Sequence, residues 1–145
     1  LREEIGFPSM KVLQFAFNPD ASSAYLPHNL IDNTVIYTGT HDNDTILGWT
    51  QNGNPAEIKF AKKYLNITAE ETFNWGLIRG AMTSVSNTAI FQMQDLLLLG
   101  NEARMNHPGT MNANWQWRMQ EDLISEEIID RLRELTRISG RLRQH

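Results

Sequence analysis

Short runs of apolar and β-branched residues, bounded by glycine, proline or asparagine, recur at three places along the chain. They cover residues 11–17, 35–38 and 88–93. Runs of about four to eight mostly apolar residues between turn-forming residues are typical of buried strands. The pattern therefore predicts three strands, the second of which ends at Gly39.

Three longer segments repeat apolar residues every three or four positions, which is the period of a helix with one buried face. The first begins at Asn54, which can cap the helix, and Pro55 suits the first helical position. The second begins with a capping box at residues 68–71, and the third covers about 125–143. The expected buried faces consist of Ile58, Ala61 and Leu65; of Phe73, Leu77, Ala81 and Val85; and of Ile128, Leu132 and Leu135.

The order of these elements is strand, loop, strand, two helices, strand, loop and helix. Short buried strands that are joined by long crossovers indicate a parallel sheet of the βαβ type. Three strands cannot close a barrel of eight. We therefore expect an α/β fold that is the C-terminal portion of a (β/α)8 TIM barrel, an incomplete domain over residues 1–145 with about three parallel strands.

The composition indicates the general class of protein but says little about its function. A hydrophobic fraction of 41% and a charged fraction of 21% are ordinary for a globular domain. The net charge of −4 argues against nucleic acid as a partner, because phosphate binding needs clustered Lys and Arg. The arginines between 131 and 143 alternate with acids on the last helix, which is typical of a solvated helix face.

Features missing from the sequence bear on the cellular compartment. There is no Cys, which excludes disulfides and thiolate metal sites and suits a reducing cytoplasm. No run approaches the roughly 20 apolar residues of a membrane span, and no signal-peptide pattern opens the chain. We therefore expect a cytoplasmic protein. Because the chain starts at Leu1 and not at Met, we also expect it to be the middle of a longer reading frame.

Candidate chemistry is concentrated directly after the second predicted strand. Gly39, which lets the backbone turn sharply, is soon followed by His41, Asp42, Asn43 and Asp44. The carboxyl ends of the strands are where α/β barrels carry their active sites. Carboxylates and amides bind sugar hydroxyls, and a carboxylate also stabilises an oxocarbenium-like transition state. The segment therefore favours a carbohydrate-active site.

Two alternatives for this segment stay open on the residues alone. A strand-end aspartate can simply cap a loop or form an Asx turn. A His–Asp pair can instead bind a metal ion, but that needs further histidines, and only His28, His107 and His145 remain. None of them lies at a helical ligand spacing from His41. We therefore expect neither a metal nor an organic cofactor.

Two loops combine aromatic and polar residues. Residues 25–29 are either a proline-fixed turn or a substrate-lining loop that contains Tyr25, a face for a sugar, and His28. Residues 101–118 contain Asn106, which suits a sugar hydroxyl, and Arg104, which could form a surface ion pair with Glu102 that is worth little. Trp115 and Trp117 alternate, so we expect at least one of them in the core and the other free to stack on a substrate.

Five segments in this order closely resemble the 4-α-glucanotransferases, which are the amylomaltases or disproportionating enzymes of the α-amylase clan. The resemblance runs from about Gly6 to the last helix and is specific because the motifs occur together. The segments are residues 6–17, 25–29, 35–44, 92–97 and 102–118.

The resemblance implies a retaining transglycosylase. A donor α-1,4-glucan is cleaved, its glucan is held covalently on an aspartate, and the 4-hydroxyl of another glucan takes it. In the family the nucleophilic Asp and the general-acid Glu lie on upstream strands, and neither motif occurs in this sequence. Asp42 matches the third family carboxylate, which binds the sugar in subsite −1 and stabilises the transition state.

The resemblance also implies a set of substrate contacts. His41 matches a hydroxyl-binding neighbour of the third carboxylate, and two phenylalanines lie where the family contacts substrate. Many relatives have an Asp directly after the second Phe, whereas this sequence has Asn18-Pro19-Asp20, so no acceptor-side role is assigned there. The implied substrate-binding residues are His41, Phe15, Phe17, His28 and Asn106.

Two hypotheses of different classes follow. In the first, the intact protein is a cytoplasmic 4-α-glucanotransferase that acts on maltodextrins, with maltooligosaccharides and neither nucleic acid nor a membrane as partners. This chain alone would be inactive, since retaining chemistry needs two carboxyl groups about 5 Å apart. In the second, the chain is a non-catalytic carbohydrate-binding or interaction module. A part-barrel leaves an open strand edge and an apolar face, so we also expect the chain alone to self-associate.

Overall fold

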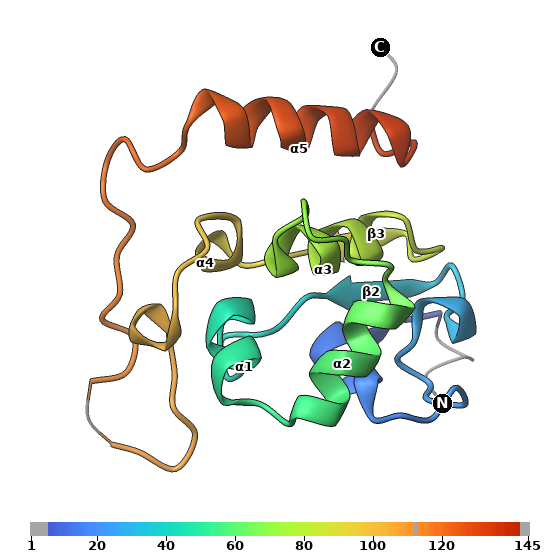
Figure 1. Ribbon diagram of the computed structural model, residues 1–145, viewed down its shortest axis with the longest axis horizontal. Helices are drawn as coiled ribbons and strands as arrows, with labels where there is room; N and C mark the ends of the chain where they lie inside the picture. The colour runs from blue at the N-terminus through green and yellow to red at the C-terminus, as the bar shows by residue number, and fades with distance from the viewer. Residues whose placement is uncertain (1–5, 112, 143–145) are drawn as a thin grey trace.

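A sheet of three parallel strands lies at the centre of the computed structural model, which describes residues 6–111 and 113–142 (Figure 1). The strands are β1 (Ser9–Val12), β2 (Thr34–Tyr37) and β3 (Thr88–Ile90), in the spatial order β1-β2-β3. Both pairings are parallel, so the predicted α/β fold with three parallel strands is confirmed.

Five α-helices and three short 3-10 helices connect and cover these strands in the part of the chain that the structure describes. The α-helices are α1 (Ile46–Asn52), α2 (Pro55–Tyr64), α3 (Phe73–Met82), α4 (Met93–Leu96) and α5 (Glu126–Ile138). The 3-10 helices are η1 (Leu13–Phe17), η2 (Pro27–Asn29) and η3 (Asn101–Ala103). Within the described ranges, none of the helices has the length and apolar character to cross a membrane.

The first predicted strand is only partly correct. Residues 11–17 were expected to be extended, but β1 ends at Val12 and the chain continues as η1. Every residue of η1 except Phe15 is buried. A single exposed position among buried neighbours fits the three-residue period of a 3-10 helix and not the two-residue period of a strand. The third predicted strand is also shorter, because β3 ends at Ile90 and Met93 already opens α4.

The predicted starts of α2 and α5 are confirmed, and both rest on a side-chain cap. The Asn54 side chain accepts a hydrogen bond from the backbone nitrogen of Ala56, and the Ser125 hydroxyl accepts one from Ile128. The last helix is shorter than expected, because α5 ends at Ile138 and Gly140 adopts a φ of +69°. A left-handed glycine directly after a helix is a common stop signal.

The predicted start of the middle helix is wrong. No helix begins at the capping box of residues 68–71, and α3 starts only at Phe73. Glu71 does not fold back onto the backbone, because its carboxylate pairs with the guanidinium of Arg79 at 2.7 and 3.0 Å. Val85, expected on the buried face, lies beyond the end of α3 and is 58% exposed.

The main core lies between one face of the sheet and the helices α1 to α3. Ile36 of β2 is fully buried there with Phe17 of η1 and Leu77 of α3. Gly76 and Gly80 allow a close approach, since an added Cβ at Gly80 would lie 2.6 Å from a methyl carbon of Leu65. Gly76 is packed in the same way, since an added Cβ there would lie 2.5 Å from side-chain carbons of Ile67.

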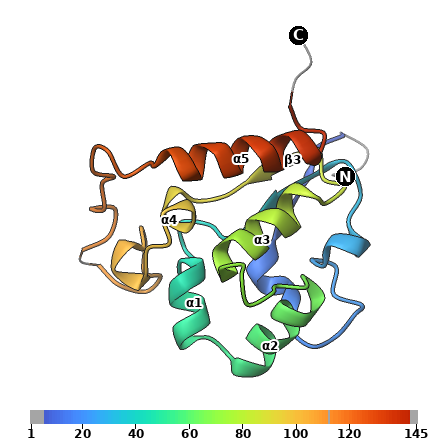
Figure 2. The ribbon, with the colours of Figure 1, turned by 45° about the horizontal axis from the view of Figure 1, so that its top comes forward.

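A second, smaller core joins α5 to the rest of the molecule. After the long irregular segment that follows α4, α5 lies alongside α3 in both ribbon views (Figures 1 and 2). Trp75 and Ile78 of α3, Leu96 of α4 and Leu135 of α5 are buried together. Leu132 and Ile128, two other members of the predicted apolar face, are half-buried against this cluster.

The other face of the sheet is more open. Met10, Tyr37 and Ile90, one from each strand, line a depression of about 310 Å³. Met10 is 54% and Ile90 43% exposed. In a closed barrel this face would point into the interior, where side chains from all strands pack in layers.

Phe17 and Phe15 make a matched pair for a stability test. We expect Phe17→Ala to lower the free energy of unfolding by about 3–5 kcal/mol, because Phe17 is fully buried between the rings of Trp49 and Tyr64. Phe15→Ala should cost less than about 1.5 kcal/mol, since Phe15 is 55% exposed and makes one edge-on contact with Tyr25. Urea unfolding of both variants tests this, and equal costs would contradict the placement of Phe17 in the core.

Candidate functional site

The candidate site starts where β2 ends. Thr38 and Gly39 are buried, and the chain then emerges as a loop that reaches the amino end of α1 through Thr45, whose hydroxyl caps that helix. Gly39 is closely packed, because a Cβ there would lie 2.8 Å from the side-chain nitrogen of Gln14, which would have to move. The loop presents His41 and Asp42 with about half of each side chain exposed, 53% and 51%.

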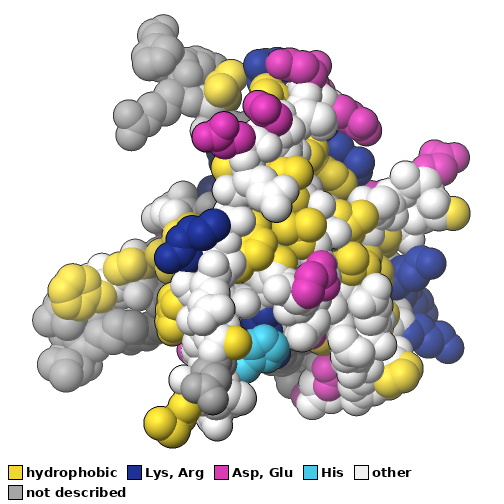
Figure 3. Space-filling model, turned by 90° about the vertical axis from the view of Figure 1, so that its left-hand side faces the viewer, with side chains coloured by type: hydrophobic (Ala, Val, Ile, Leu, Met, Phe, Trp, Pro, Cys, Tyr) yellow, Lys and Arg dark blue, Asp and Glu magenta, His cyan; other side chains and the backbone are white. Residues whose placement is uncertain are grey.

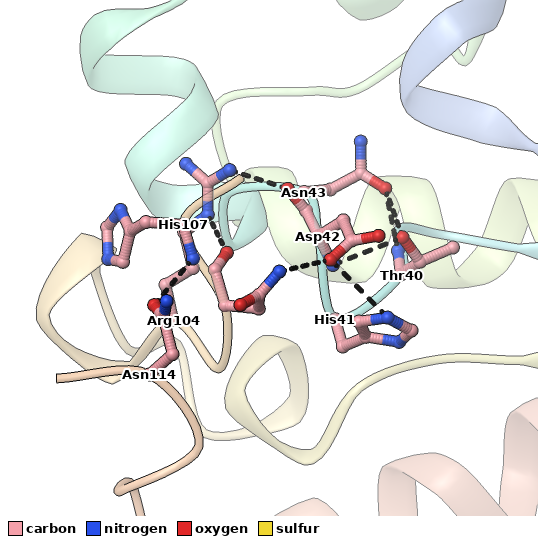
Figure 4. A network of polar contacts seen from close by, with 8 residues as sticks. Thr40, His41, Asp42, Asn43, Arg104, His107 and Asn114 are labelled. Atoms are coloured by element: carbon pink, nitrogen blue, oxygen red, sulfur yellow. Dashed lines mark hydrogen bonds and ion pairs between the residues drawn. The ribbon is translucent and has the colours of Figure 1, made fainter. Parts of the chain in front are cut away.

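One oxygen of Asp42 has two polar neighbours (Figure 4). The amide nitrogen Nδ2 of Asn106 donates to Oδ1 of Asp42 at 2.6 Å, and Nε2 of His41 lies 3.4 Å from the same oxygen. No hydrogen bond from the residues that the structure describes reaches Oδ2 of Asp42. As far as the described residues show, this oxygen is open to a ligand hydroxyl, and half of the side chain is exposed.

A second loop, which follows η3, is fastened onto the first by hydrogen bonds (Figure 4). The guanidinium of Arg104 donates to the backbone carbonyl of Asp42 at 2.5 Å and to that of Asn106 at 2.9 Å. The backbone nitrogen of Asn106 also donates to the carbonyl of His41 at 3.0 Å. Sequence reasoning gave Arg104 no more than a surface ion pair with Glu102 and so missed this contact, since nothing in the local sequence shows that residue 104 meets residue 42.

The second loop has its own internal support. The side-chain oxygen of Asn114 accepts a hydrogen bond from the backbone nitrogen of His107 at 2.9 Å. The backbone nitrogen of Trp115 donates to the carbonyl of Met105 at 2.6 Å. These bonds close the loop on itself on either side of Asn106.

Trp115 forms an aromatic wall beside His41. The two ring centroids are 4.9 Å apart, and Trp115 is 51% exposed. The expectation that Trp115 or Trp117 lies in the core is wrong, because Trp117 is only half-buried. The two side chains do not alternate as in a strand, because Trp115 has a φ of +64° and is not extended.

The remaining predicted contacts lie on another part of the molecule, around η1 and η2. Phe15 is exposed and packs edge-on against Tyr25. His28 is exposed, and its ring nitrogens already have partners in the hydroxyl of Tyr64, at 2.7 Å, and the carbonyl of Ala21, at 3.1 Å. Phe17 is fully buried, so its predicted role as a substrate contact does not fit the structure.

The η1 segment is nevertheless joined to the site loop. The side-chain nitrogen of Gln14 donates to the carbonyl of Asp44 at 3.0 Å. Phe15 is the next residue and is exposed, so it stands on an element that is fixed to the Asp42 loop. Phe15 therefore stays a candidate for contact with a ligand that is longer than one sugar.

Asp95 is a buried acid close to the site to which the sequence assigned no role. It is 1% exposed, and it accepts hydrogen bonds from the hydroxyl of Thr38 at 2.9 Å and from the backbone nitrogen of Ile46 at 2.8 Å. Burial raises the pKa of Asp95 to about 6, against the lowering effect of these hydrogen bonds. Within residues 6–111 and 113–142, no group of three or more His, Cys, Asp or Glu side chains converges on a cation site.

Comparison with known proteins places this arrangement in a family. The model of the 4-alpha-glucanotransferase family matches residues 1–124 of the chain. A 4-alpha-glucanotransferase of Clostridium butyricum is 50% identical over 97% of this chain and 29% of its own length. The chloroplastic/amyloplastic 4-alpha-glucanotransferase of Arabidopsis thaliana is 47% identical over 98% of the chain and 25% of its own length.

Solved structures agree with this placement. The amylomaltase of Streptococcus agalactiae, solved in complex with acarbose, superimposes with a TM-score of 0.94 at 37% identity. The match covers 98% of this chain and 29% of that structure, and it confirms the expected fold as a portion of a (β/α)8 barrel. The amylomaltase of Corynebacterium glutamicum shares the fold with a TM-score of 0.56 at 16% identity.

The relatives are much longer than the chain, which spans between a quarter and a third of the length of each of the relatives named above. The site described above is therefore only a part of what a whole relative contains. From the family match over residues 1–124 and from these identities, we conclude that the chain belongs to the 4-alpha-glucanotransferase family.

Proposed function

We propose that the protein to which this chain belongs is a retaining 4-α-glucanotransferase that moves α-1,4-glucan segments between maltodextrins. The observation that carries the proposal is the Asp42 carboxylate, which stands at the carboxyl end of a parallel strand with one oxygen held and the other open. Family membership supports the reaction type, and a relative's structure contains acarbose.

In this proposal Asp42 acts on the sugar ring whose glycosidic bond is cleaved. Its open oxygen accepts a hydroxyl of that sugar, and its negative charge stabilises the positive charge that develops on the ring in the transition state. Asn106 holds the other oxygen by a hydrogen bond, so the carboxylate needs little reorientation as the charge develops, and His41 lies beside the same oxygen. The nucleophile and the general acid would come from residues outside this chain.

We further propose that the substrate is bound by the exposed residues of the predicted set. His41 and Asn106 adjoin Asp42, and the exposed ring of Phe15 provides an apolar face farther along a bound glucan. His28 also belongs to this set, because its side chain is exposed and can be reached by a substrate. Phe17 is left out because it is fully buried.

The place of the chain in the whole protein is part of the same proposal. We propose that residues 1–145 form the C-terminal part of the catalytic barrel and that the intact enzyme works in the cytoplasm. A sequence without Cys suits a reducing compartment. The names of the plant relatives place those proteins in chloroplasts or amyloplasts, so the compartment differs among members of the family.

Replacing Asp42 tests the catalytic role directly. In the full-length enzyme, Asp42→Asn should lower kcat by about 100-fold or more, because the amide keeps the shape of the side chain and loses the charge that stabilises the transition state. The thermal unfolding midpoint should change little, since half of the Asp42 side chain is exposed. Asp130→Asn, on the exposed face of α5, is the control and should leave kcat unchanged. Full activity of Asp42→Asn would refute the assignment.

The chain by itself should not catalyse transfer. We expect maltotriose to stay intact on incubation with the 145-residue chain, because retaining transfer needs a second carboxyl group about 5 Å from the first. Of two other acids close to the site, Asp95 is buried, and Asp44 accepts a hydrogen bond from the backbone nitrogen of Thr45. Separation of the products by chain length measures this, and the appearance of glucose with longer maltodextrins would show that a complete site is present.

The same sample distinguishes the alternative of a non-catalytic binding module. Trp115 lies against His41 and is half-exposed, so a glucan bound at Asp42 should change its fluorescence. A saturable change on titration with maltooligosaccharide, without turnover, would favour the binding module for the isolated chain. This outcome would not affect the proposal for the intact enzyme.

We also propose that the chain alone self-associates. A groove of about 450 Å³ runs between α4 and α5, with Met93, Leu96, Ile128 and Leu132 among its lining residues. Figure 3 shows hydrophobic side chains gathered over the middle of the face that it presents. Exposed apolar surface of this kind is buried by association when no other partner covers it.

The oligomeric state in solution tests this proposal. Sedimentation of the isolated chain should give a mass above that of a monomer of 16.7 kDa, increasing with concentration. Ile128→Glu and Leu132→Glu would place charge in the groove and should shift the distribution towards the monomer. A monomer at every concentration would contradict the proposal.

A further inference from the structure

We propose that Asp95 is a positioning residue for Asp42, because its buried carboxylate holds both ends of the loop that carries Asp42. The inference rests on the proposed function and extends it to a residue that touches no substrate. It concerns an acid that the transfer chemistry itself does not use.

Asp95 and the two groups that donate to it, on Thr38 and Ile46, form a clamp on the loop. Thr38 and Ile46 stand at the two ends of the loop. Thr38 directly follows the last residue of β2, and its hydroxyl donates to Oδ2 of Asp95 at 2.9 Å. Ile46 is the first residue of α1, and its backbone nitrogen donates to Oδ1 at 2.8 Å. Residues 39–45, which include His41 and Asp42, lie between them. One carboxylate therefore fixes the distance between the entry and the exit of the loop.

The clamp itself is rigidly supported. The side-chain nitrogen of Asn74, on α3, donates to the backbone carbonyl of Asp95 at 2.7 Å, and the backbone nitrogen of Asp95 donates to Gln92 at 3.1 Å. Asp95, Thr38 and Asn74 are each exposed by 1% or less. Hydrogen bonds to a carboxylate in such a dry environment are stronger than those between neutral groups at the surface.

A carboxylate is a poor choice for a residue that only fills space in the core, so Asp95 is expected to have another role. A buried carboxylate without a cation is costly in free energy, and the burial that raises the pKa of Asp95 to about 6 expresses that cost. Asp44, on the clamped loop, adds a second negative charge nearby. An apolar residue would avoid both penalties but could not accept hydrogen bonds from Thr38 and Ile46. The advantage of a carboxylate at this position is that it accepts both of these hydrogen bonds.

Asp42 is thus fixed from two sides. Asp95 holds the loop ends from within the core, while Arg104 and Asn106 hold the loop from the second loop. Catalytic carboxylates must be placed to a fraction of an ångström, and a displacement of about 1 Å can cost about 100-fold in rate. If the loop keeps its bonds to Arg104 and Asn106 but loses one bond to Asp95, the protein should still fold. The turnover rate should fall, because Asp42 is no longer held in position.

A pair of isosteric substitutions on β2 and its extension tests the clamp. Replacing Asp95 itself would strand the Ile46 nitrogen and endanger folding, so Thr38→Val removes only one bond of the clamp. Thr34→Val is the matched control, because Thr34 is equally buried and its hydroxyl bonds to Ser9 at 3.3 Å at the opposite end of β2. Both changes delete one buried hydroxyl and keep the shape of the side chain.

Two measurements on the full-length enzyme decide the outcome. Thr38→Val should lower kcat about 10- to 100-fold with a smaller change in KM for maltotriose, whereas Thr34→Val should stay within about twofold of wild type. The backbone amides of residues 40–44 should exchange hydrogen faster in Thr38→Val than in Thr34→Val. Equal kcat values, or equal exchange of these amides, would overturn the proposal.

The exchange measurement separates this inference from the proposed function. If the wild-type enzyme fails to disproportionate maltotriose, the proposed function fails whatever the variants do. If the wild type is active and Thr38→Val exchanges and turns over like Thr34→Val, only the clamp fails. Thermal unfolding of both variants accompanies the kinetics, and a loss of rate that simply follows the loss of stability in both would also count against the clamp.

Discussion

The parallel pairing of β2 with both of its neighbours is the constraint on which the rest of the structure depends. Parallel strands end at the same edge of the sheet, so the segments after β1, β2 and β3 must meet there. Thr38 marks the meeting point, because its backbone nitrogen donates to Ile90 and its carbonyl accepts from Gln14. The loop with Asp42, the η1 segment and Asp95 come together for that reason.

The site shows how a charged group can be both exposed and fixed. Asp42 keeps half of its side chain in solvent, which a substrate hydroxyl requires, yet its backbone and one of its oxygens are bound by Arg104 and Asn106. The loop that carries it is tied to the core at both ends through Asp95. The exposed carboxylate of Asp42 and the buried carboxylate of Asp95 therefore act together. The buried hydrogen bonds of Asp95 restrict the position of the exposed Asp42.

Much of the fold could be predicted because it rests on local chemistry. The caps at Asn54 and Ser125 are set by side chains that bond two or three residues ahead, so the sequence alone places the start of α2 and α5. The start of α3 could not be found this way, because Glu71 gives its carboxylate to Arg79 and does not close a capping box. A bond to a distant partner replaces the local one there, and periodicity does not reveal it.

The sequence by itself determined the parallel α/β class, the loop after β2 and the identity of Asp42, His41 and Asn106 as candidates, since strand pattern and local motifs depend on neighbours along the chain. Only the tertiary structure decided that Phe17 is buried, that Trp115 lies against His41 and that Arg104 and Asp95 hold the Asp42 loop. Asp95 is 49 residues from Ile46, and Arg104 is 62 residues from Asp42. Hydrogen bonds act over about 3 Å, so contacts between such distant residues exist only once the sheet has brought the two segments together.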